Sequence, residues 1–386
     1  MELFDISELK TRAERFGRQL SVQNIDCAVL TSNQDLFYFT GSVQKGTVVI
    51  TGSGEISYFV KKNFSRAETE TPLEIEEWDI GKIAAKIQGV WAMPFDITSL
   101  AEHSFYKGKL EKGPAADCSF ALALTKMIKS ETEIKLIKKA GLINQRVMEF
   151  AKTVYHPGTR DIDIQAEIEG YAKKELGHQG LFWVRGSNME ASMGLVVTGT
   201  DALEPTYTDF PIGGAGISPA VAQGASGRAV SESFVVDFIG SCLGYCADST
   251  RTFFTTEPSL QISSVYSELN GLLEEIVSSS VPGKTGDEIY GHAMSIVEKR
   301  PWKDLFMGYS QKVRFIGHGI GTEVNQLPVL APKQKTPLEN GMVIAIEPKI
   351  FVPEYGIVGL ENTYVLENGR LRSITGDCSR INDWII

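Results

Sequence analysis

The sequence contains few of the features that mark membrane or secreted proteins. It has no run of 18 consecutive apolar residues, and the segment Met1–Phe16 is charged and amphipathic instead of carrying the apolar core of a signal peptide. The five cysteines are an odd number, and none of them belongs to the CxxC pair of a zinc knuckle. These absences predict free thiols and a reduced, cytoplasmic location.

Basic charge is also scarce. Lys and Arg number 38 against 48 Asp and Glu, which gives a formal net charge of −10. Proteins that bind nucleic acid through its phosphates need a basic face, so nucleic acid is not an expected partner. The chain lacks low-complexity segments, and its 42% hydrophobic content with dispersed glycines and prolines is typical of a mixed α/β globular protein.

The length of 386 residues suits two domains, one smaller than the other. In the first part of the chain, strand-type and helical runs alternate. A helix to about Gln19 precedes a buried strand over Asp26–Thr31, and the turn at Gly52–Gly54 predicts a β-hairpin. We predict one domain over 1–124 and a second over 125–386.

The second part begins with a helix start, because Ser130 and Glu133 have the spacing of a capping box. Further helices are predicted over 162–176, after Pro258 and around 289–297. Strands that carry acidic residues follow each pair of helices. The order of helix, helix and acidic strands therefore occurs twice, which suggests a duplicated architecture.

Two aspartates stand close together in the first set of acidic strands. Asp237 ends the apolar run Ser-Phe-Val-Val-Asp, and Asp248 follows eleven residues later, with Gly240 and Gly244 between them to form a turn. The two strands of a hairpin would place both carboxylates side by side. Their mutual repulsion would raise at least one pKa unless a cation neutralised them.

The second set of acidic strands supplies further ligands for a cation. His318 lies in Gly-His-Gly-Ile-Gly, and Glu347 and Glu361 interrupt strongly β-prone runs, where a charged side chain is costly without a partner. Four carboxylates and one imidazole balance two divalent cations. Such an oxygen-rich set with a single nitrogen suits Mn, Co, Zn or Fe(II), and it does not resemble the ligand set of a structural zinc site.

These motifs carry a family resemblance. VVDF, ADSTRTF, GHGIG, IEP and GLENTYV, in this order, resemble the pita-bread metallopeptidases, which include aminopeptidase P, prolidase and methionine aminopeptidase, and their relative creatinase. The first 122 residues also resemble a creatinase-type amino-terminal domain. The resemblance implies an α/β (α+β) fold, with a pita-bread catalytic domain after a smaller creatinase-type α/β domain.

The resemblance also implies the roles of the five residues. Asp237 would chelate one ion, His318 and Glu347 would bind the other, and Asp248 and Glu361 would bridge the two. A hydroxide bridging the ions would attack a peptide or related amide, with Glu347 as the proton carrier and His318 as the second predicted catalytic residue. Members of the family commonly pair as homodimers, so a homodimer is expected.

The substrate-contacting residues depart from the family pattern. A Pro-His pair normally precedes the first metal-binding Asp, but here the count back from Asp237 reaches Pro219 and Ala220. Where a second family histidine follows the GHGIG motif, this chain has Asn325, which cannot shuttle a proton near pH 7. The predicted substrate-binding residues are therefore Asn325, Arg251 and Arg185, with Arg251 equally suited to holding the hairpin.

Three functions remain open at this point. The first is a dinuclear metal-dependent hydrolase, Xaa-Pro dipeptidase-like or aminopeptidase-like, acting on a peptide or related amide. The second is a non-peptidase enzyme that performs C–N cleavage or elimination on a small metabolite, which the missing histidines favour. The third is a non-catalytic relative that binds peptides or proteins, against which the retention of every metal ligand counts.

Overall fold

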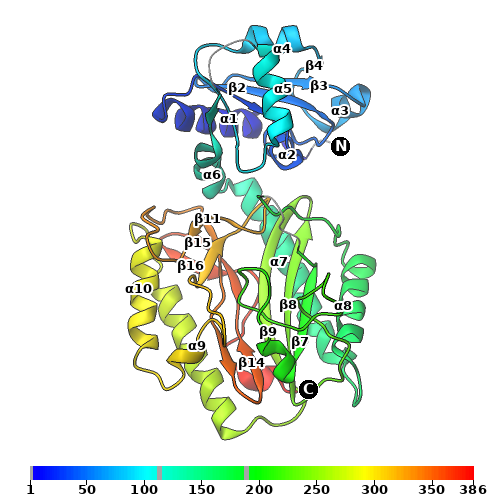
Figure 1. Cartoon of the computed structure of the whole chain (residues 1–386), viewed down its shortest axis with the longest axis vertical. Helices are drawn as coiled ribbons and strands as arrows, with labels where there is room; N and C mark the ends of the chain where they lie inside the picture. The colour runs from blue at the N-terminus through cyan, green and yellow to red at the C-terminus, as the bar shows by residue number, and fades with distance from the viewer. Residues whose placement is uncertain (1–2, 111–114, 187–190) are drawn as a thin grey trace. The chain divides into compact units, whose positions relative to one another are not determined.

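A computed structural model describes residues 3–110, 115–186 and 191–386 (Figure 1). Contacts divide the chain into two compact units, Met1–Met127 with Arg185–Asn188, and Ile128–Val184 with Met189–Ile386. The predicted division into 1–124 and 125–386 stays a proposal, which limited proteolysis would test. Among the described residues, no helix is both long and apolar enough to cross a membrane.

The amino-terminal unit is built on one mixed six-stranded sheet. The order is β4-β3-β2-β1-β5-β6, with β2 antiparallel to both β1 and β3, so the predicted hairpin is present. The remaining neighbours, β3 with β4, β1 with β5 and β5 with β6, are parallel. The strands are β1 (Cys27–Leu30), β2 (Gly46–Thr51), β3 (Ile56–Val60), β4 (Ile75–Glu77), β5 (Trp91–Met93) and β6 (Ala116–Asp117).

Helices cover both faces of this sheet because its central strand is apolar throughout. Ala28 and Leu30 of β1 belong to one core cluster, and the alternate residues Cys27 and Val29 belong to the other. Helices α1 and α2 contribute to the first cluster, and α4 and α5 to the second. The helices are α1 (Ile6–Val22), α2 (Asn33–Thr40), α3 (Phe64–Glu70), α4 (Ile80–Lys86), α5 (Leu100–Leu110) and α6 (Ser119–Met127).

The second unit has the predicted order of two helices and strands, repeated once. The Ser130 capping box is present, since Glu133 N–H donates to the Ser130 hydroxyl and Ser130 N–H donates to the Glu133 carboxylate. In Figure 1, α7 and α8 lie on one side of the strands, and α9 and α10 lie on the other. The helices are α7 (Glu131–Val154), α8 (Asp161–Glu175), α9 (Leu260–Ser279) and α10 (Gly286–Val297).

Three sheets lie between these helices. One has the order β7-β8-β9, the second β11-β10-β12-β15-β16, and the third consists of β13 and β14. The strands are β7 (Gly194–Thr198), β8 (Ser233–Cys242), β9 (Tyr245–Phe254), β10 (Gly317–Gly319), β11 (Gln326–Val329), β12 (Val343–Ile346), β13 (Lys349–Val352), β14 (Gly356–Gly359), β15 (Asn362–Glu367) and β16 (Arg370–Ser373). Short 3₁₀ helices are η1 (Gly199–Leu203), η2 (Lys303–Leu305) and η3 (Ile381–Trp384).

Candidate metal centre

The β8–β9 hairpin brings the two predicted aspartates onto one face. Asp237 pairs with Thr250 and Ile239 pairs with Asp248, so the aspartates lie two residues apart along the ladder on the same side. The Asn144 side chain of α7 donates to the carbonyls of Phe238 and Ala247 and so fixes both strands.

Close packing of α7 against this hairpin depends on Gly240. A Cβ at Gly240 would lie 2.1 Å from Asn144 Oδ1 and 2.4 Å from the Ala140 carbonyl oxygen. Any side chain there would push the strand away from the helix.

The other three predicted ligands come from the carboxyl-terminal strands. His318 lies in β10, Glu347 directly follows β12, and Glu361 lies between β14 and β15. The Glu361 N–H donates to the Thr250 carbonyl at 3.1 Å, which ties this segment to β9 next to the aspartates. Segments as far apart as Thr250 and Glu361 thus meet at one site.

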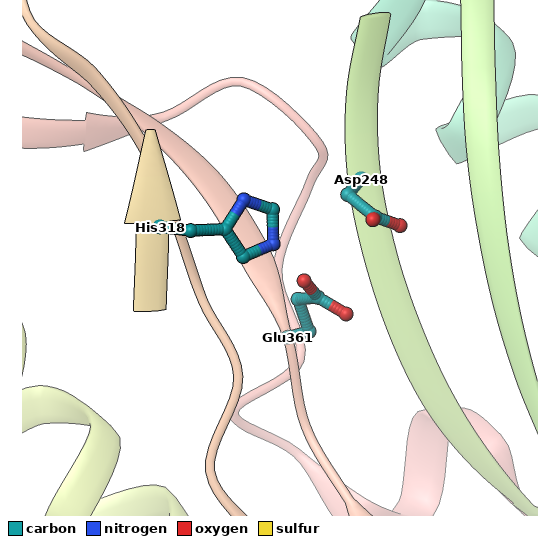
Figure 2. A group of neighbouring side chains, drawn as sticks. All are labelled: Asp248, His318 and Glu361. Carbon is teal, nitrogen blue, oxygen red and sulfur yellow. The ribbon is translucent and has the colours of Figure 1, made fainter. Parts of the chain in front are cut away.

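Asp248, His318 and Glu361 form the tightest group (Figure 2). Each offers one ligand atom, and these atoms lie within 4.8 Å of one another in a buried position. The ring Nδ1 of His318 lies 3.1 Å from the Gly319 carbonyl, which can only accept a hydrogen bond. Nδ1 therefore carries the proton, and Nε2 is left with a lone pair for a metal ion.

A buried oxygen of this group supports the metal interpretation. Glu361 Oε1 is inaccessible to solvent and has no hydrogen-bond partner among the described residues. A buried carboxylate oxygen without a partner is costly, and a cation held jointly with Asp248 and His318 would satisfy it. The three residues therefore fit a divalent ion.

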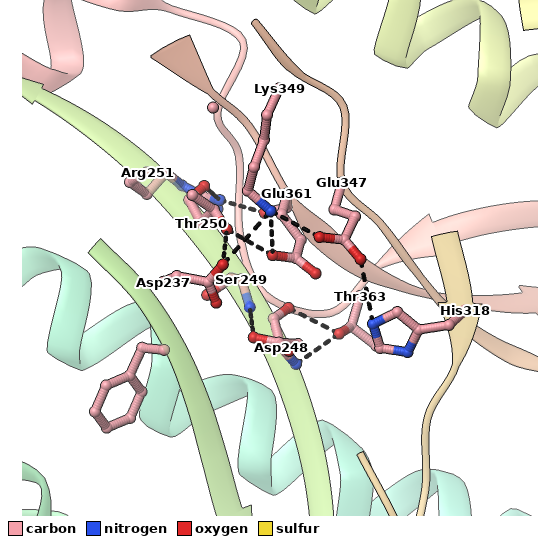
Figure 3. Close-up of polar contacts among 12 residues, drawn as sticks. Asp237, Asp248, Ser249, Thr250, Arg251, His318, Glu347, Lys349, Glu361 and Thr363 are labelled. Atoms are coloured by element: carbon pink, nitrogen blue, oxygen red, sulfur yellow. Dashed lines mark hydrogen bonds and ion pairs between the residues drawn. The ribbon is translucent and has the colours of Figure 1, made fainter. Parts of the chain in front are cut away.

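Lys349 lies within the same cluster (Figure 3). Its Nζ is 2.7 Å from Glu347 Oε2, 3.5 Å from Asp237 Oδ2 and 3.6 Å from Glu361 Oε2. The other oxygen of Glu347 is 3.5 Å from His318 Nε2, so Glu347 lies between the lysine and the histidine.

Burial and mutual repulsion make the cluster hold protons in the absence of an ion. Burial, followed by repulsion from Glu361, raises the pKa of Asp248 well above its usual range. Burial also raises the pKa of Glu361 to about 8 and that of Glu347 above its ordinary value. Burial opposes the charge of Lys349, but the carboxylates around it, Glu347 first, outweigh this and raise its pKa.

A pocket opens on the cluster. Asp237, Asp248, His318 and Glu347 form its polar part. The remaining lining residues are mostly apolar: Ala191, Ser192, Leu195, Phe210, Ile212, Gln223, Ile239 and Val324. A site with a few converging polar groups in an apolar pocket is typical of small-molecule and peptide binding.

Gln223 is the lining residue whose polar group has no partner. Its side-chain nitrogen is buried and makes no hydrogen bond with any described residue. Ala220, which counting placed at the usual histidine position, is exposed and does not line this pocket. The segment before Asp237 therefore contributes Gln223 to the pocket.

The three predicted substrate-binding residues lie elsewhere. Arg251 is buried and donates to the Glu361 carbonyl at 2.5 Å and to Asn362 Oδ1 at 2.7 Å, so it holds the ligand-bearing segment in place. Arg185 belongs to the amino-terminal unit, where it pairs with Asp35 and Asp96. The positions of Arg251 and Arg185 therefore do not support the predicted contacts with substrate.

Asn325 is half-buried, and its neighbour Val324, not Asn325 itself, lines the pocket. The substrate role of Asn325 stays a prediction.

Two residues of the site were not predicted from the sequence. Lys349 begins a strand in Pro-Lys-Ile-Phe-Val, where alternation would place a lysine on a solvent face, and only its position two residues after Glu347 hinted at the site. Gln223 lies in a glycine-rich loop without a regular period, so its direction could not be read from spacing.

Comparison with known proteins agrees with this geometry. Residues 135–368 match Metallopeptidase family M24, and residues 12–124 match the Creatinase/Prolidase N-terminal domain. The chain is 25% identical over 378 residues to Uncharacterized peptidase YqhT of Bacillus subtilis, covering 94% of this chain and 97% of the relative. It is 23% identical over 356 residues to the Xaa-Pro dipeptidase of Pyrococcus horikoshii, covering 90% and 92%.

Solved structures confirm the predicted fold. The Xaa-Pro dipeptidase from Bacillus anthracis superposes with a TM-score of 0.80 at 21% identity, covering 98% of this chain and 100% of that one. The α/β pita-bread architecture with its creatinase-type amino-terminal domain is therefore correct. Because the catalytic-unit match spans more than half of the chain and includes all five predicted ligands, the chain belongs to Metallopeptidase family M24.

Proposed function

We propose that this chain is a metal-dependent dipeptidase or aminopeptidase that cleaves the amide bond of small peptides, with Xaa-Pro dipeptides as the first class to test. The observation that carries this proposal is the buried group Asp248, His318 and Glu361, of which Asp248 and His318 line a pocket with apolar walls. Relatives named as Xaa-Pro dipeptidases support the substrate class.

Asp248, His318 and Glu361 would hold the divalent ion, with Glu347 beside them. When bound, such an ion polarises a carbonyl oxygen and lowers the pKa of water toward neutrality. We include Mn, Co, Zn or Fe(II) in the proposal because carboxylate oxygens and one imidazole nitrogen suit these ions. The predicted second ion would have to share Asp237 and Glu361 with the ammonium of Lys349.

Glu347 is the residue best placed to carry a proton. One of its oxygens faces His318 Nε2 at 3.5 Å, and burial raises the pKa of Glu347 above its usual value, which favours proton uptake; Glu347 would take a proton from water and return it to the leaving amine. Lys349 holds the other oxygen at 2.7 Å and so orients the carboxylate.

The rest of the pocket would position the substrate. The Gln223 amide nitrogen would donate to a carbonyl or carboxylate oxygen of the peptide, since it has no other described partner. Leu195, Phe210, Ile212 and Val324 offer apolar surface for a ring such as that of proline. Water would be displaced from this side of the peptide on binding.

The test is hydrolysis of a panel of Xaa-Pro and Xaa-Xaa dipeptides and tripeptides by protein reconstituted with Mn, Co or Zn. Turnover that disappears in Asp248→Ala and persists in the matched surface change Asp304→Ala would support the proposal, because Asp304 is exposed. No turnover from protein that holds metal would contradict it.

A second candidate is C–N cleavage or elimination on a small metabolite. It is favoured by one observation: neither Ala220 nor Asn325 offers a histidine to the pocket, and Ala220 is exposed. Metal-loaded protein that fails on every peptide but acts on a small amide or amidine would support this candidate.

Our proposal also includes the predicted homodimer and cytoplasmic location, which sedimentation and cell fractionation would test.

A further inference from the structure

The side chain of Lys349 is directed into the metal centre by the fold itself. Lys349 pairs with Gly359 across β13 and β14, and a Cβ at Gly359 would lie 3.1 Å from Lys349 Cγ. Because Gly359 has no side chain, the aliphatic part of the Lys349 side chain can pass beside it. The side chain is fully buried, so its charged end has no access to water.

The Lys349 ammonium makes the contacts with carboxylate oxygens that a metal cation in this position would make. It carries three protons, and three carboxylate oxygens lie around it, from Glu347 at 2.7 Å, Asp237 at 3.5 Å and Glu361 at 3.6 Å. Figure 3 shows these contacts converging on the lysine nitrogen.

Thr250 cannot replace this charge. Its hydroxyl lies 2.9 Å from Asp237 Oδ2 and 2.6 Å from Glu361 Oε2, yet it has a single proton to donate. One of these two oxygens therefore needs another partner, and Lys349 is within reach of both.

Asp237 Oδ2 and Glu361 Oε2, which Lys349 approaches, are oxygens through which a second metal ion would bind, whereas Glu361 Oε1 has no described partner and is available to the ion that Asp248 and His318 hold. An ion at the usual distance of about 2.2 Å from Asp237 Oδ2 could lie no more than about 5.7 Å from the lysine nitrogen. A dication and an ammonium this close in a buried site repel strongly, because little water is present to screen them. The ammonium and an ion held by Asp237 therefore compete for the same carboxylate oxygens.

We infer that the Lys349 ammonium takes the place of one of the two metal ions, so that this chain binds a single divalent ion through Asp248, His318 and Glu361. Asp237 then serves as a partner of Lys349 and not as a metal ligand. The inference rests on the metal binding in the proposed function, but not on the bond that is cleaved. It departs from the dinuclear arrangement that the resemblance implies.

The experiment counts bound ions. Wild-type protein, Lys349→Met and Lys349→Ala are stripped with chelator, saturated with Mn²⁺ and freed of unbound metal, and the metal per chain is measured by mass spectrometry. Electron paramagnetic resonance of the same samples separates isolated ions from magnetically coupled pairs. We expect one isolated ion per wild-type chain and two coupled ions in the lysine variants.

A third variant keeps the test valid if removal of the buried lysine prevents folding. Asp237→Asn should still bind one ion per chain, because Asp237 contacts Lys349 and not the ion. A loss of metal in Asp237→Asn, or two coupled ions in the wild type, would overturn the inference while leaving a metal-dependent hydrolase intact. Lysine variants that fold and still bind one ion would also overturn it, and no bound metal in the wild type would count against the proposed function as well.

Discussion

Each unit of this protein holds a cluster of charged side chains around a buried carboxylate, and the two clusters differ in their balance of charge. In the amino-terminal unit, Asp35 and Asp96 face Lys126 and Arg185, with Asp35 bonded to Lys126 at 2.7 Å and to Arg185 at 3.0 Å. In the catalytic unit, Asp237, Glu347 and Glu361 lie within ion-pair distance of Lys349, the one Lys or Arg among the described residues that lies so close to them, and Asp248 is a fourth carboxylate of the same cluster.

The difference explains which cluster can bind a cation. Among the described ion pairs of the amino-terminal cluster, each base faces an acid, so these charges offset one another. Its balance is visible in Asp35, where burial would raise the pKa but Lys126 and Arg185 hold it well below its usual range. The catalytic cluster has more acids than bases, and burial raises the pKa values of Asp248 and Glu361 instead. An unbalanced buried cluster is a functional site, and a balanced one is structural.

The largest effect is expected from breaking the unbalanced cluster. Asp248→Asn removes a ligand of the proposed ion, and because a metal ion supplies several kcal/mol of transition-state stabilisation, hydrolysis should fall about a thousandfold or more. The melting temperature of metal-free protein should not fall, since one of four mutually repelling carboxylates has become neutral. Steady-state kinetics and thermal melting of the same preparation measure both, and a destabilised but active variant would contradict the comparison.

The balanced cluster should respond in the opposite way. Asp35→Asn leaves Lys126 and Arg185 without their buried carboxylate, and breaking a buried ion pair from one side typically costs about 3–5 kcal/mol. Urea denaturation followed by circular dichroism measures this loss against the exposed control Asp304→Asn. A loss no larger than that of the control would show that the cluster is not a structural ion pair.

The two clusters should also differ in their dependence on pH. A raised pKa stabilises the fold fully below the unfolded value and loses this contribution as pH rises through the folded value, which for Glu361 is about 8. Asp35 has a lowered pKa, so its contribution is present at neutral pH and is lost only in acid.

Metal-free protein should therefore melt at lower temperature as pH rises from 5 to 9, and Glu361→Gln should show a shallower decline. Melting temperatures that stay level or rise over this range in the wild type would contradict the sign of the Glu361 shift.

The smallest effect is expected from Gln223, whose neutral amide lines the pocket beside the catalytic cluster. Gln223→Ala removes one amide donor from the pocket, and a neutral hydrogen bond contributes about 0.5–1.5 kcal/mol, so KM should rise about three- to tenfold with a smaller change in kcat. Asn325→Ala is the matched comparison, because Asn325 does not line the pocket. Equal effects of the two changes would remove Gln223 from the proposed positioning role.

Much of this molecule was predictable from the sequence because its signals are local. The capping box at Ser130 depends on two residues three apart, and the structure confirms it. The hairpin that carries Asp237 and Asp248 follows from apolar runs around glycines, and the structure pairs its strands as expected. The meeting of these residues with His318 and Glu361 came from resemblance, since no local rule joins segments so far apart.

The missed features depend on tertiary packing. Lys349 in a β-prone run has the appearance of a solvent-facing residue, but it is buried beside Gly359 of the neighbouring strand, where a Cβ would lie only 3.1 Å from Lys349 Cγ. Arg185 was expected at the substrate, but its partners Asp35 and Asp96 lie about a hundred residues earlier in the sequence and give no local sign of the pairing. Charge partners at long range are set by the fold and not by spacing.

The most direct test of the account measures hydrolysis of an Xaa-Pro dipeptide as a function of Mn²⁺ bound per chain in one series of samples. The account predicts that chelator-stripped protein is inactive and that activity rises in proportion to bound Mn²⁺ up to one ion per chain. Full activity in stripped protein, or no activity at any loading on any peptide of the panel, would contradict it.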